Sequence, residues 1–391
     1  MTVRSINNDV IYVGSIHWDR RIFDELIPLP EGTSYNAYLI KGSEKTALID
    51  SVDPEKWHEL ETNLCELGIE KLDYIITNHS EQDHSGAIPM LLEKYPEAKV
   101  VTNEKCKAFE MDHLHICEDK FIVIKDNETL SLGNKTLRFL MTPWVHWPET
   151  MVTYLEEDKI LFSCDFFGSH YAGSELYAGD NAIVVHGAKR YYAEIMMPFR
   201  TTIIKNIDKV TQFDIKLIAP SHGPIYDKPE VIIEAYRDWT SDKVKKEVLI
   251  PFVSMHGSTK LMVDYLTDSL LKKGFSVKPF NLPVTDVGEL AMSLVDASTI
   301  IIGSPMVLAG AHPAAVYATF LANALRPKTK FVSIIGSFGW GGKMIDQLTG
   351  LISNLKVDVI EPVLCKGMPR EEDYRKIDEM VEILEEKHKS L

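Results

Sequence analysis

The chain has 391 residues and a formal net charge of −15, with 45% hydrophobic and 25% charged residues. At roughly 100–200 residues per domain, this length predicts two domains. The acidic balance argues against non-specific binding to nucleic acid or to an anionic membrane. No apolar run approaches the roughly 20 residues of a membrane span, and no signal peptide is recognisable, so we expect a cytoplasmic protein.

The five cysteines are scattered along the chain, and none forms a Cys-x-x-Cys pair. This spacing argues against both a disulfide framework and an iron–sulfur site. We therefore expect the cysteines to be reduced and to serve packing.

Up to about residue 240, the sequence mixes short strands with helices. Helical periodicity predicts a helix over 54–68, another that opens at Ser85 or Gly86 and ends before Pro96, and a third over 201–210. Apolar stretches between polar turns predict strands over 9–16, 36–40, 46–50, 72–77, 99–102, 121–125, 137–142, 151–157, 159–164 and 215–219.

The stretch 78–86, Asn-His-Ser-Glu-Gln-Asp-His-Ser-Gly, crowds metal-ligand side chains directly after a predicted strand. In an extended loop alternate residues point the same way, so His79, Glu81 and Asp83 can converge on one spot. His84 then faces a neighbouring spot. That geometry suits two adjacent metals that share one loop.

Three further candidate ligands stand at the ends of other predicted strands, each before a glycine or proline turn: His146, Asp165 and His222. A lone histidine in such a place is more often a hydrogen-bonded core residue than a ligand. Loops at strand ends are nevertheless a common place for functional side chains, and the whole set favours a metal site.

Together these positions resemble the signature of the metallo-β-lactamase fold, His-x-His-x-Asp-His followed by a His, an Asp and a His. Glu81 stands where the second histidine would be, which is similar to the diiron subgroup, the flavodiiron proteins. Exchanging an imidazole for a carboxylate makes the site harder and more anionic, which suits iron better than zinc.

The resemblance implies two irons bridged by Asp165. His170, in the segment after the bridging aspartate, is implied as a pocket residue or proton donor. The resemblance assigns one iron to His79, Glu81 and His146 and the other to Asp83 and His222, with His84 ligating in only some family members.

From about residue 247 onward, apolar strands alternate with helices. Strands are predicted over 246–253, 275–282, 297–304, 330–337 and 357–363, and a helix over 260–274. The alternation is typical of βαβ units, and five such strands suit a doubly wound parallel sheet of the flavodoxin type. The charged stretch 241–247 predicts the boundary, which gives domains 1–246 and 247–391.

The stretch 254–259, Ser-Met-His-Gly-Ser-Thr, follows the first of these strands and opens a helix. Small residues let backbone amides face an anion, and the helix N-terminus adds favourable charge. The stretch resembles the FMN phosphate loop of flavodoxins. Two glycine-rich loops, 303–310 and 336–342, follow the third and fourth strands, at the edge where open α/β sheets bind ligands.

The resemblance implies FMN-binding positions in all three loops: Ser254, Met255, His256, Gly257, Ser258, Thr259, Ser304, Pro305, Met306, Ser337, Phe338, Gly339, Trp340 and Gly341. Trp340 is a candidate to stack on the flavin, and the alternative is a tryptophan that packs between glycines. Met306 departs from the threonine that the family often has. No G-x-G-x-x-G fingerprint follows a strand, so a Rossmann NAD(P) site is not expected.

Both motif sets, in this order, resemble the flavodiiron proteins over nearly the whole chain. The implied architecture is an N-terminal metallo-β-lactamase-like αββα sandwich of the α+β class, followed by a flavodoxin-like α/β domain. The implied activity is that of an oxidoreductase with FMN and two non-haem irons per chain. It reduces dioxygen to water, nitric oxide to nitrous oxide, or both, with dioxygen the expected substrate.

No rubredoxin or flavin reductase segment is recognisable, so we expect an external electron donor. The resemblance implies rubredoxin or a reduced deazaflavin coenzyme. The acidic surface would repel either donor unless local basic residues, such as Lys328 and Lys330, steer it. A domain of about 150 residues has a radius of gyration of roughly 15 Å, which puts two cofactors far apart within one chain. The family solution is a head-to-tail homodimer, or a tetramer of two such dimers.

Two other functions stay open on the sequence. One is a dizinc hydrolase of the metallo-β-lactamase fold with a flavodoxin-like appendage, and the other is an electron carrier with an inactive N-terminal scaffold. Glu81 and the FMN loops argue against the hydrolase, and the complete ligand set argues against the carrier. Iron content tests the first alternative, and substrate turnover tests the second.

Overall fold

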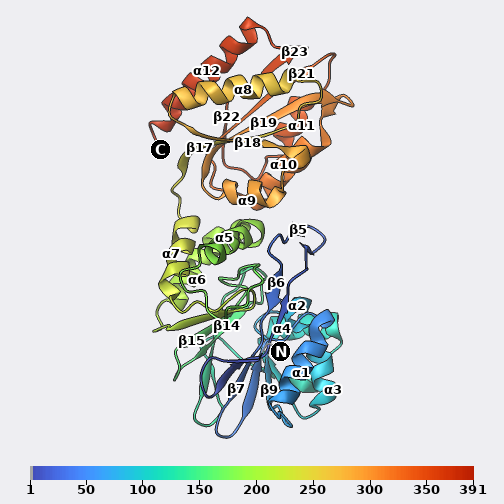
Figure 1. Ribbon diagram of the computed structural model, residues 1–391, viewed down its shortest axis with the longest axis vertical. Coiled ribbons are helices and arrows are strands. Elements are labelled where there is room, and N and C mark those ends of the chain that lie inside the picture. Colours follow the sequence, from blue (N-terminus) through green and yellow to red (C-terminus); the bar gives the residue numbers. More distant parts are fainter. Residues whose placement is uncertain (1–2) are drawn as a thin grey trace. The chain divides into compact units, whose positions relative to one another are not determined.

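The computed structural model describes residues 3–391 and divides into two compact units. The first unit comprises residues 3–192 and Phe199–Thr240, and the second comprises Ala193–Pro198 and Ser241–Leu391. The chain therefore changes unit at the start of the charged stretch 241–247. Figure 1 shows the elements of each unit.

The first unit is built on two sheets, with strand orders β1-β2-β7-β8-β9-β10-β11 and β12-β13-β14-β15-β16. The larger sheet consists of β1 Arg4–Ser5, β2 Val10–Tyr12, β7 Tyr38–Lys41, β8 Thr46–Ile49, β9 Tyr74–Ile76, β10 Lys99–Thr102 and β11 Phe121–Val123. The smaller sheet consists of β12 Thr129–Ser131, β13 Thr136–Met141, β14 Met151–Leu155, β15 Ile160–Cys164 and β16 Leu217–Pro220. Two short pairs complete the strands, β3 Ser15–His17 with β6 Thr33–Tyr35, and β4 Ile22–Phe23 with β5 Ile27–Pro28.

The two sheets pack face to face because alternate strand residues are apolar on the inner side. Ile49 and Ile76 of the larger sheet share one core with Phe139 and Phe162 of the smaller sheet, and all four are essentially fully buried. The opposite face of the larger sheet forms a second core with α1 and α3. The first unit is thus a sandwich with helices outside.

The helices of the first unit flank both sheets (Figure 1). The Asn103 side chain caps α4 by accepting hydrogen bonds from two backbone amides, and the Asn181 side chain caps α5 by accepting one, from the Ile183 N–H. The helices are α1 Trp57–Glu66, α2 Gln82–Ser85, α3 Ile88–Lys94, α4 Glu104–Leu114, α5 Ala182–Tyr191, α6 Arg200–Val210 and α7 Pro229–Thr240.

The second unit is a parallel sheet with helices packed on it, in the order β18-β17-β19-β21-β22, with β20 paired to β19 and β23 paired to β21. This is strand order 2-1-3-4-5, that of flavodoxin. Its strands are β17 Lys245–Phe252, β18 Ser276–Asn281, β19 Ala297–Val307, β20 Gly310–Ala311, β21 Phe331–Phe338, β22 Asp358–Val359 and β23 Val363–Lys366. Its helices are α8 Ser258–Lys272, α9 Val287–Leu294, α10 Pro313–Leu325, α11 Met344–Gly350 and α12 Glu371–His388.

The fifth strand differs from the predicted continuous strand over 357–363. It is divided into β22 and β23, and Pro362 lies in the gap between them. Proline has no backbone N–H to donate to β21, so the ladder is interrupted there. On the face with α8 and α12, Ile250, Ile301 and Ile335 pack in one core with Leu266.

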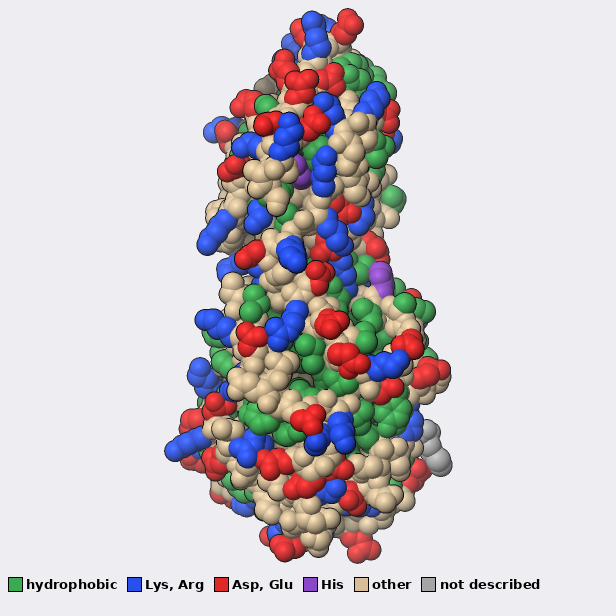
Figure 2. Space-filling model, turned by 90° about the vertical axis from the view of Figure 1, so that its left-hand side faces the viewer, with side chains coloured by type: hydrophobic (Ala, Val, Ile, Leu, Met, Phe, Trp, Pro, Cys, Tyr) green, Lys and Arg blue, Asp and Glu red, His purple; other side chains and the backbone are tan. Residues whose placement is uncertain are grey.

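The surface carries both signs of charge. On the face drawn in Figure 2, Lys and Arg side chains are interspersed with Asp and Glu, so the net charge of −15 is not gathered in one acidic patch there. All five cysteines are free thiols. Cys106, Cys164 and Cys365 are buried, in line with the predicted packing role, whereas Cys65 and Cys117 are exposed, so that prediction is wrong for these two. Among residues 3–391, none of the helices combines the length and the apolar character that a membrane crossing requires.

Candidate metal centre and flavin-binding loops

Hydrogen bonds fix the start of the stretch 78–86, where the chain leaves β9. Asp50, directly after β8, accepts a hydrogen bond from the backbone N–H of Asn78 at 2.8 Å and another from its side-chain amide at 2.9 Å. The Asn78 side chain in turn accepts from the hydroxyl of Thr153 on β14 at 2.8 Å. The chain therefore enters the candidate site in a fixed direction.

The prediction that 78–86 is an extended loop is wrong after Glu81. Gln82–Ser85 forms the short helix α2, and Glu81 is its extended N-cap residue. Asp83 and His84 are consecutive helical residues, so a helical turn, and not strand-like alternation, separates their directions. The outcome for function is the same, because the two side chains still face the same centre from α2.

The other candidate ligands come from the second sheet. Asp165 follows β15 and His222 lies two residues after β16, and these strands are parallel neighbours. Their carboxyl ends therefore meet at one edge of the sandwich. His146 lies in the turn after β13, where the Thr150 hydroxyl donates to the Thr142 carbonyl and closes the turn.

The first donor group consists of His79, Glu81, His146 and Asp165, whose candidate ligand atoms all lie within 4.8 Å of one another. The Oε2 atom of Glu81 is 3.1 Å from His79 Nε2 and 3.2 Å from His146 Nε2. The Oδ2 atom of Asp165 is 3.4 Å and 3.3 Å from the same two nitrogens.

The second donor group consists of Asp83, His84 and His222. The Nε2 atoms of His84 and His222 lie 3.3 Å and 3.2 Å from Asp83 Oδ2. They also lie 2.9 Å and 3.4 Å from Asp165 Oδ1. The two carboxylate oxygens of Asp165 thus face two different donor groups.

Charge is balanced inside this buried site. Burial lowers the pKa of His146, but the neighbouring carboxylates of Asp165 and Glu81 outweigh it and raise that pKa to about 9. Burial likewise lowers the pKa of His222, and Asp165 and Asp83 raise it to about 10. Burial raises the pKa of Asp165, yet the surrounding imidazoles, His84 first, hold it well below the ordinary value.

The donor atoms fit metal cations. Both carboxylate oxygens of Asp83 and Asp165 and the Nε2 atom of His84 are buried, and no hydrogen bond of standard geometry reaches them from the described residues. A buried polar atom left unpaired costs about 1–3 kcal/mol, more when it is charged. Two cations, one in each donor group, would satisfy these atoms, and mixed imidazole and carboxylate donors suit iron.

Residues outside the donor groups orient the ligands. The Nδ1 atom of His79 donates to Glu149 Oε1 at 2.6 Å, and Ser80 donates to the same oxygen from its backbone N–H and its hydroxyl. The Nδ1 atom of His222 donates to the Ser34 carbonyl at 2.7 Å. Such partners fix the ring orientation of metal-binding histidines.

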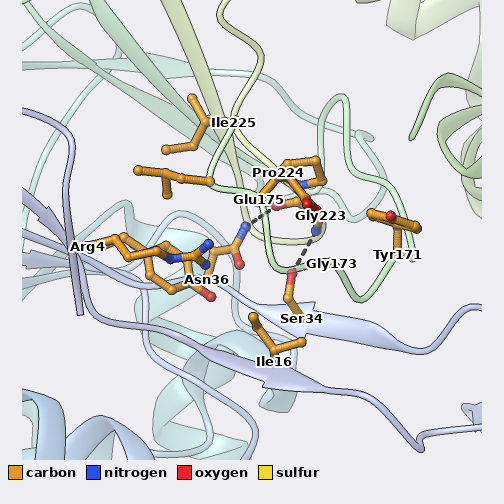
Figure 3. Close-up of a pocket in the computed structure, with 12 residues that line it drawn as sticks. Arg4, Ile16, Ser34, Asn36, Tyr171, Gly173, Glu175, Gly223, Pro224 and Ile225 are labelled. Atoms are coloured by element: carbon orange, nitrogen blue, oxygen red, sulfur yellow. Dashed lines mark hydrogen bonds between the residues drawn. The ribbon is translucent and has the colours of Figure 1, made fainter. Parts of the chain in front are cut away.

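Ser34 and Asn36, which line a small cavity (Figure 3), fix the turn that carries His222 by hydrogen bonds. The Gly223 N–H donates to Ser34 Oγ at 2.8 Å. The side-chain amide of Asn36 donates to the carbonyls of Pro220 and Gly223, each at 2.7 Å. Main-chain and side-chain groups of β6 and the next residue therefore position this ligand.

Comparison with known proteins agrees with this geometry. A family model described as ODP family beta lactamase matches residues 33–223. The nitric oxide reductase of Moorella thermoacetica is 35% identical to this chain over 387 residues, which cover 96% of each protein. The chain belongs to the flavodiiron protein family.

Solved structures extend the match over both units. The rubredoxin oxygen:oxidoreductase of Desulfovibrio gigas superposes with a TM-score of 0.95 at 30% identity, covering 99% of each chain. The flavodiiron protein of Giardia intestinalis superposes with a TM-score of 0.89 at 27% identity, covering 99% of this chain and 98% of the other. The predicted pair of a metallo-β-lactamase-like fold and a flavodoxin-like fold is confirmed.

His170 of this flavodiiron protein lies beside the second donor group. Its ring is buried, with its centroid 4.8 Å from those of His222 and Tyr191 and 5.2 Å from that of Phe23. Burial and then the neighbouring His222 hold its pKa well below the ordinary value. Its role in the pocket stays a prediction.

The candidate FMN loops lie at the carboxyl ends of β17, β19 and β21. Gly257, with φ of +92°, is the N-cap residue of α8, and the Ser254 hydroxyl accepts from the Lys260 N–H of the first turn at 3.2 Å. The hydroxyls of Ser258 and Thr259 lie 2.8 Å and 3.1 Å from Ser337 Oγ. The phosphate-loop candidate and the carboxyl end of β21 are thus in direct contact.

The remaining flavin candidates differ in how they are placed. Trp340 is 76% exposed, so the alternative of a tryptophan packed between glycines is wrong. The buried hydroxyl of Ser304 donates to the Pro305 carbonyl and accepts from the His312 N–H, so the main chain already engages it. Met306 lies near the end of β19 and pairs with Ala311 of β20.

One predicted steering residue is misplaced. Lys328 is only 6% exposed, and its Nζ lies 4.0 Å from Asp296. It cannot present charge to an approaching donor, so that expectation is wrong, while Lys330 is half-buried.

Sequence reasoning missed the residues that orient the ligands. Glu149 could have been found, because it is an acidic residue only three positions after the candidate ligand His146. Ser34 acts through its carbonyl, which any residue supplies, so no sequence signal could have found it.

Proposed function

We propose that this flavodiiron protein reduces dioxygen to water, nitric oxide to nitrous oxide, or both, at two non-haem irons supplied with electrons through FMN. The names of its relatives point to both substrates, one being a nitric oxide reductase and another a rubredoxin oxygen:oxidoreductase. The observation that carries the proposal is Asp165, whose two carboxylate oxygens face two separate donor groups.

The proposed ligand assignment follows the two donor groups. Asp165 would bridge the irons, and Glu81 would add the carboxylate that favours iron over zinc in the first group. His84 is proposed as a full ligand of the second iron, because its Nε2 lies 3.3 Å from Asp83 Oδ2 and 2.9 Å from Asp165 Oδ1. The first iron would be held by His79, Glu81, His146 and Asp165, and the second by Asp83, His84, His222 and Asp165.

When bound, the irons supply electrons and Lewis acidity to a small diatomic substrate, and FMN supplies the electrons singly. The protein's own contribution is orientation and charge. Glu149 holds His79 and the Ser34 carbonyl holds His222, so both imidazoles present Nε2 to the centre. The buried carboxylates offset the positive charge that two cations bring into a dry site.

FMN is proposed to bind at the carboxyl edge of the second sheet. The α8 N-terminus after Gly257 offers the backbone amides of Ser258 and Thr259 to the phosphate, while the Lys260 amide donates to the Ser254 hydroxyl. Ser258, Thr259 and Ser337 form one hydroxyl cluster beside these amides, and exposed Trp340 is available to the flavin ring. Because the Ser304 hydroxyl already bonds to the main chain, we propose that the backbone of Ser304, and not its hydroxyl, contacts FMN.

Electron delivery, assembly and location complete the proposal. The donor is proposed to be external, either rubredoxin, which the name of the Desulfovibrio gigas relative contains, or a reduced deazaflavin coenzyme. A head-to-tail homodimer, or a tetramer built from it, would pair the FMN of one copy with the irons of another. The protein is proposed to be cytoplasmic.

Turnover with each gas tests the proposed function. Anaerobically purified protein carrying FMN and iron is mixed with reduced rubredoxin, and dioxygen or nitric oxide is followed with an electrode. We expect consumption of at least one gas and its loss in Asp165→Asn. Absence of consumption of both gases, with iron and FMN present and with reduced deazaflavin also tried, would contradict the proposal. Hydrolysis by a zinc-loaded sample would instead support the hydrolase.

A further inference from the structure

The strand β6 contacts two histidines of the site through one hydroxyl. Thr33 is fully buried, and its Oγ1 lies 2.9 Å from His170 Nδ1. The same oxygen lies 3.4 Å from His222 Nδ1 and 3.4 Å from the carbonyl of Ser34. Thr33 has a single hydroxyl proton, so only one of these atoms can receive it at full strength.

The distances show which atom accepts the hydrogen bond from the Thr33 hydroxyl. The Ser34 carbonyl already accepts from His222 Nδ1 at 2.7 Å, which is much shorter than its 3.4 Å distance to Thr33. An O–H···acceptor bond normally has a length of 2.5–3.0 Å when the acceptor is oxygen, so 3.4 Å is a weak contact. The remaining short partner of Thr33 is the Nδ1 atom of His170. If Nδ1 donated to Thr33 instead, the hydroxyl proton would be left with only the 3.4 Å contact to the Ser34 carbonyl, so the distances favour Nδ1 as the acceptor.

A histidine whose Nδ1 accepts a hydrogen bond carries its proton on Nε2 when the ring is neutral. His170 is in this position, because the Thr33 hydroxyl lies 2.9 Å from its Nδ1. The rings of Phe23, Tyr191 and His222 pack around the imidazole and restrict its rotation. Its Nε2 is buried and has no hydrogen-bond partner among the described residues.

We propose that Thr33 is a positioning residue that holds His170 as the Nε2–H tautomer, so that this N–H donates a hydrogen bond to the substrate at the metal centre. The inference rests on the proposed function, because the substrate is the small diatomic molecule assigned there. A fixed donor in a dry pocket stabilises negative charge that develops on the substrate, at no cost of reorganisation. Sequence reasoning gave His170 a role without a mechanism, and Thr33 supplies one.

Neutron diffraction from deuterated crystals of the oxidised holoprotein tests the tautomer directly. We expect deuterium on His170 Nε2, none on Nδ1, and the Thr33 hydroxyl deuteron directed at Nδ1. Deuterium on Nδ1 would overturn the proposal. This readout does not depend on which metal is bound or on turnover, so it fails separately from the proposed function.

Two matched variants test the consequence. Thr33→Val removes the hydroxyl and keeps the shape, whereas Thr33→Ser keeps the hydroxyl and removes a methyl group. With iron and FMN contents equal to wild type, we expect kcat to fall about 10-fold in Thr33→Val and to stay within about 2-fold in Thr33→Ser. Azide is the ligand probe, titrated into the oxidised protein by its absorption band. Its Kd should rise about 10-fold in Thr33→Val alone.

Equal kcat and equal azide Kd in all three proteins would refute the role of the hydroxyl. Equal losses in both variants would also refute it, because packing, and not hydrogen bonding, would then explain them. If Thr33→Val fails to retain iron, the neutron map of the wild-type protein decides alone.

Discussion

Replacing Glu149 by glutamine tests how much the outer partner of a ligand contributes to metal binding. The Glu149 side chain is fully buried, and its Oε1 accepts from His79 Nδ1 at 2.6 Å. Burial raises its pKa, but the bond and charge of His79 outweigh this, so the pKa is lowered and the group is ionised at neutral pH. The amide keeps the shape and removes the charge that makes His79 a stronger ligand.

The expected magnitude follows from this contact. Outer partners of metal-binding histidines typically contribute 10- to 100-fold in metal affinity, which is about 1.4–2.7 kcal/mol. The amide oxygen of Glu149→Gln still accepts from Nδ1, so we expect the lower end, about a 10-fold loss, and about 100-fold in Glu149→Ala. FMN content should not change, because the flavin candidates lie in the other unit.

The assay is the retention of iron against a graded series of a ferrous chelator under anaerobic conditions. Glu110→Gln is the matched control, since Glu110 is also a fully buried carboxyl in the first unit, and burial raises its pKa to about 8. At pH 7 it is mostly neutral, so the amide changes little charge, and it belongs to neither donor group. Equal iron retention in wild type and Glu149→Gln, or an equal loss in the control, would refute the reasoning.

Three further predictions follow from the site. Glu81→Gln should lower iron occupancy and turnover while leaving FMN bound, and unchanged iron content would exclude Glu81 as a ligand. Gly257→Ala should weaken FMN binding about 10-fold, because a left-handed φ costs a side chain about 1–2 kcal/mol, whereas Gly350→Ala, at the end of α11, should be silent in the same fluorescence titration. In metal-free protein the carboxylates raise the pKa of His146 and His222 from 6.5 to about 9 and about 10. Their contribution to the free energy of unfolding is therefore complete below pH 6.5 and lost as pH rises to about 10, and a urea titration showing constant or rising stability over that range would contradict this.

Most of the metal site could be predicted from the types of its residues and their order in the sequence. The acids and histidines of the site follow strands that are buried for other reasons, and parallel pairing of β15 with β16 brings Asp165 and His222 to the same edge. The local geometry of 78–86 was not predictable from alternation, because α2 begins directly after Glu81. Tertiary contacts, and not strand propensity, decide the path of so short a segment.

Other misses have similar physical causes. The predicted strand over 9–16 is broken at Gly14, where a Cβ would lie 2.3 Å from the Tyr35 carbonyl oxygen. The helix α4 escaped prediction because it has no apolar stripe, its buried residues being Cys106 and Glu110. Buried Lys328 shows that a charged residue in a loop need not reach the solvent.

The central claim is a dinuclear iron site in the first unit, and elemental metal content per chain tests it most directly. The protein is purified anaerobically after growth in iron-rich medium, and iron, zinc and manganese are measured together. The account predicts two irons per chain, with both lost together in Asp165→Ala because that carboxylate faces both donor groups. Two zincs per chain under the same conditions would contradict it and would restore the hydrolase as the better account of this fold.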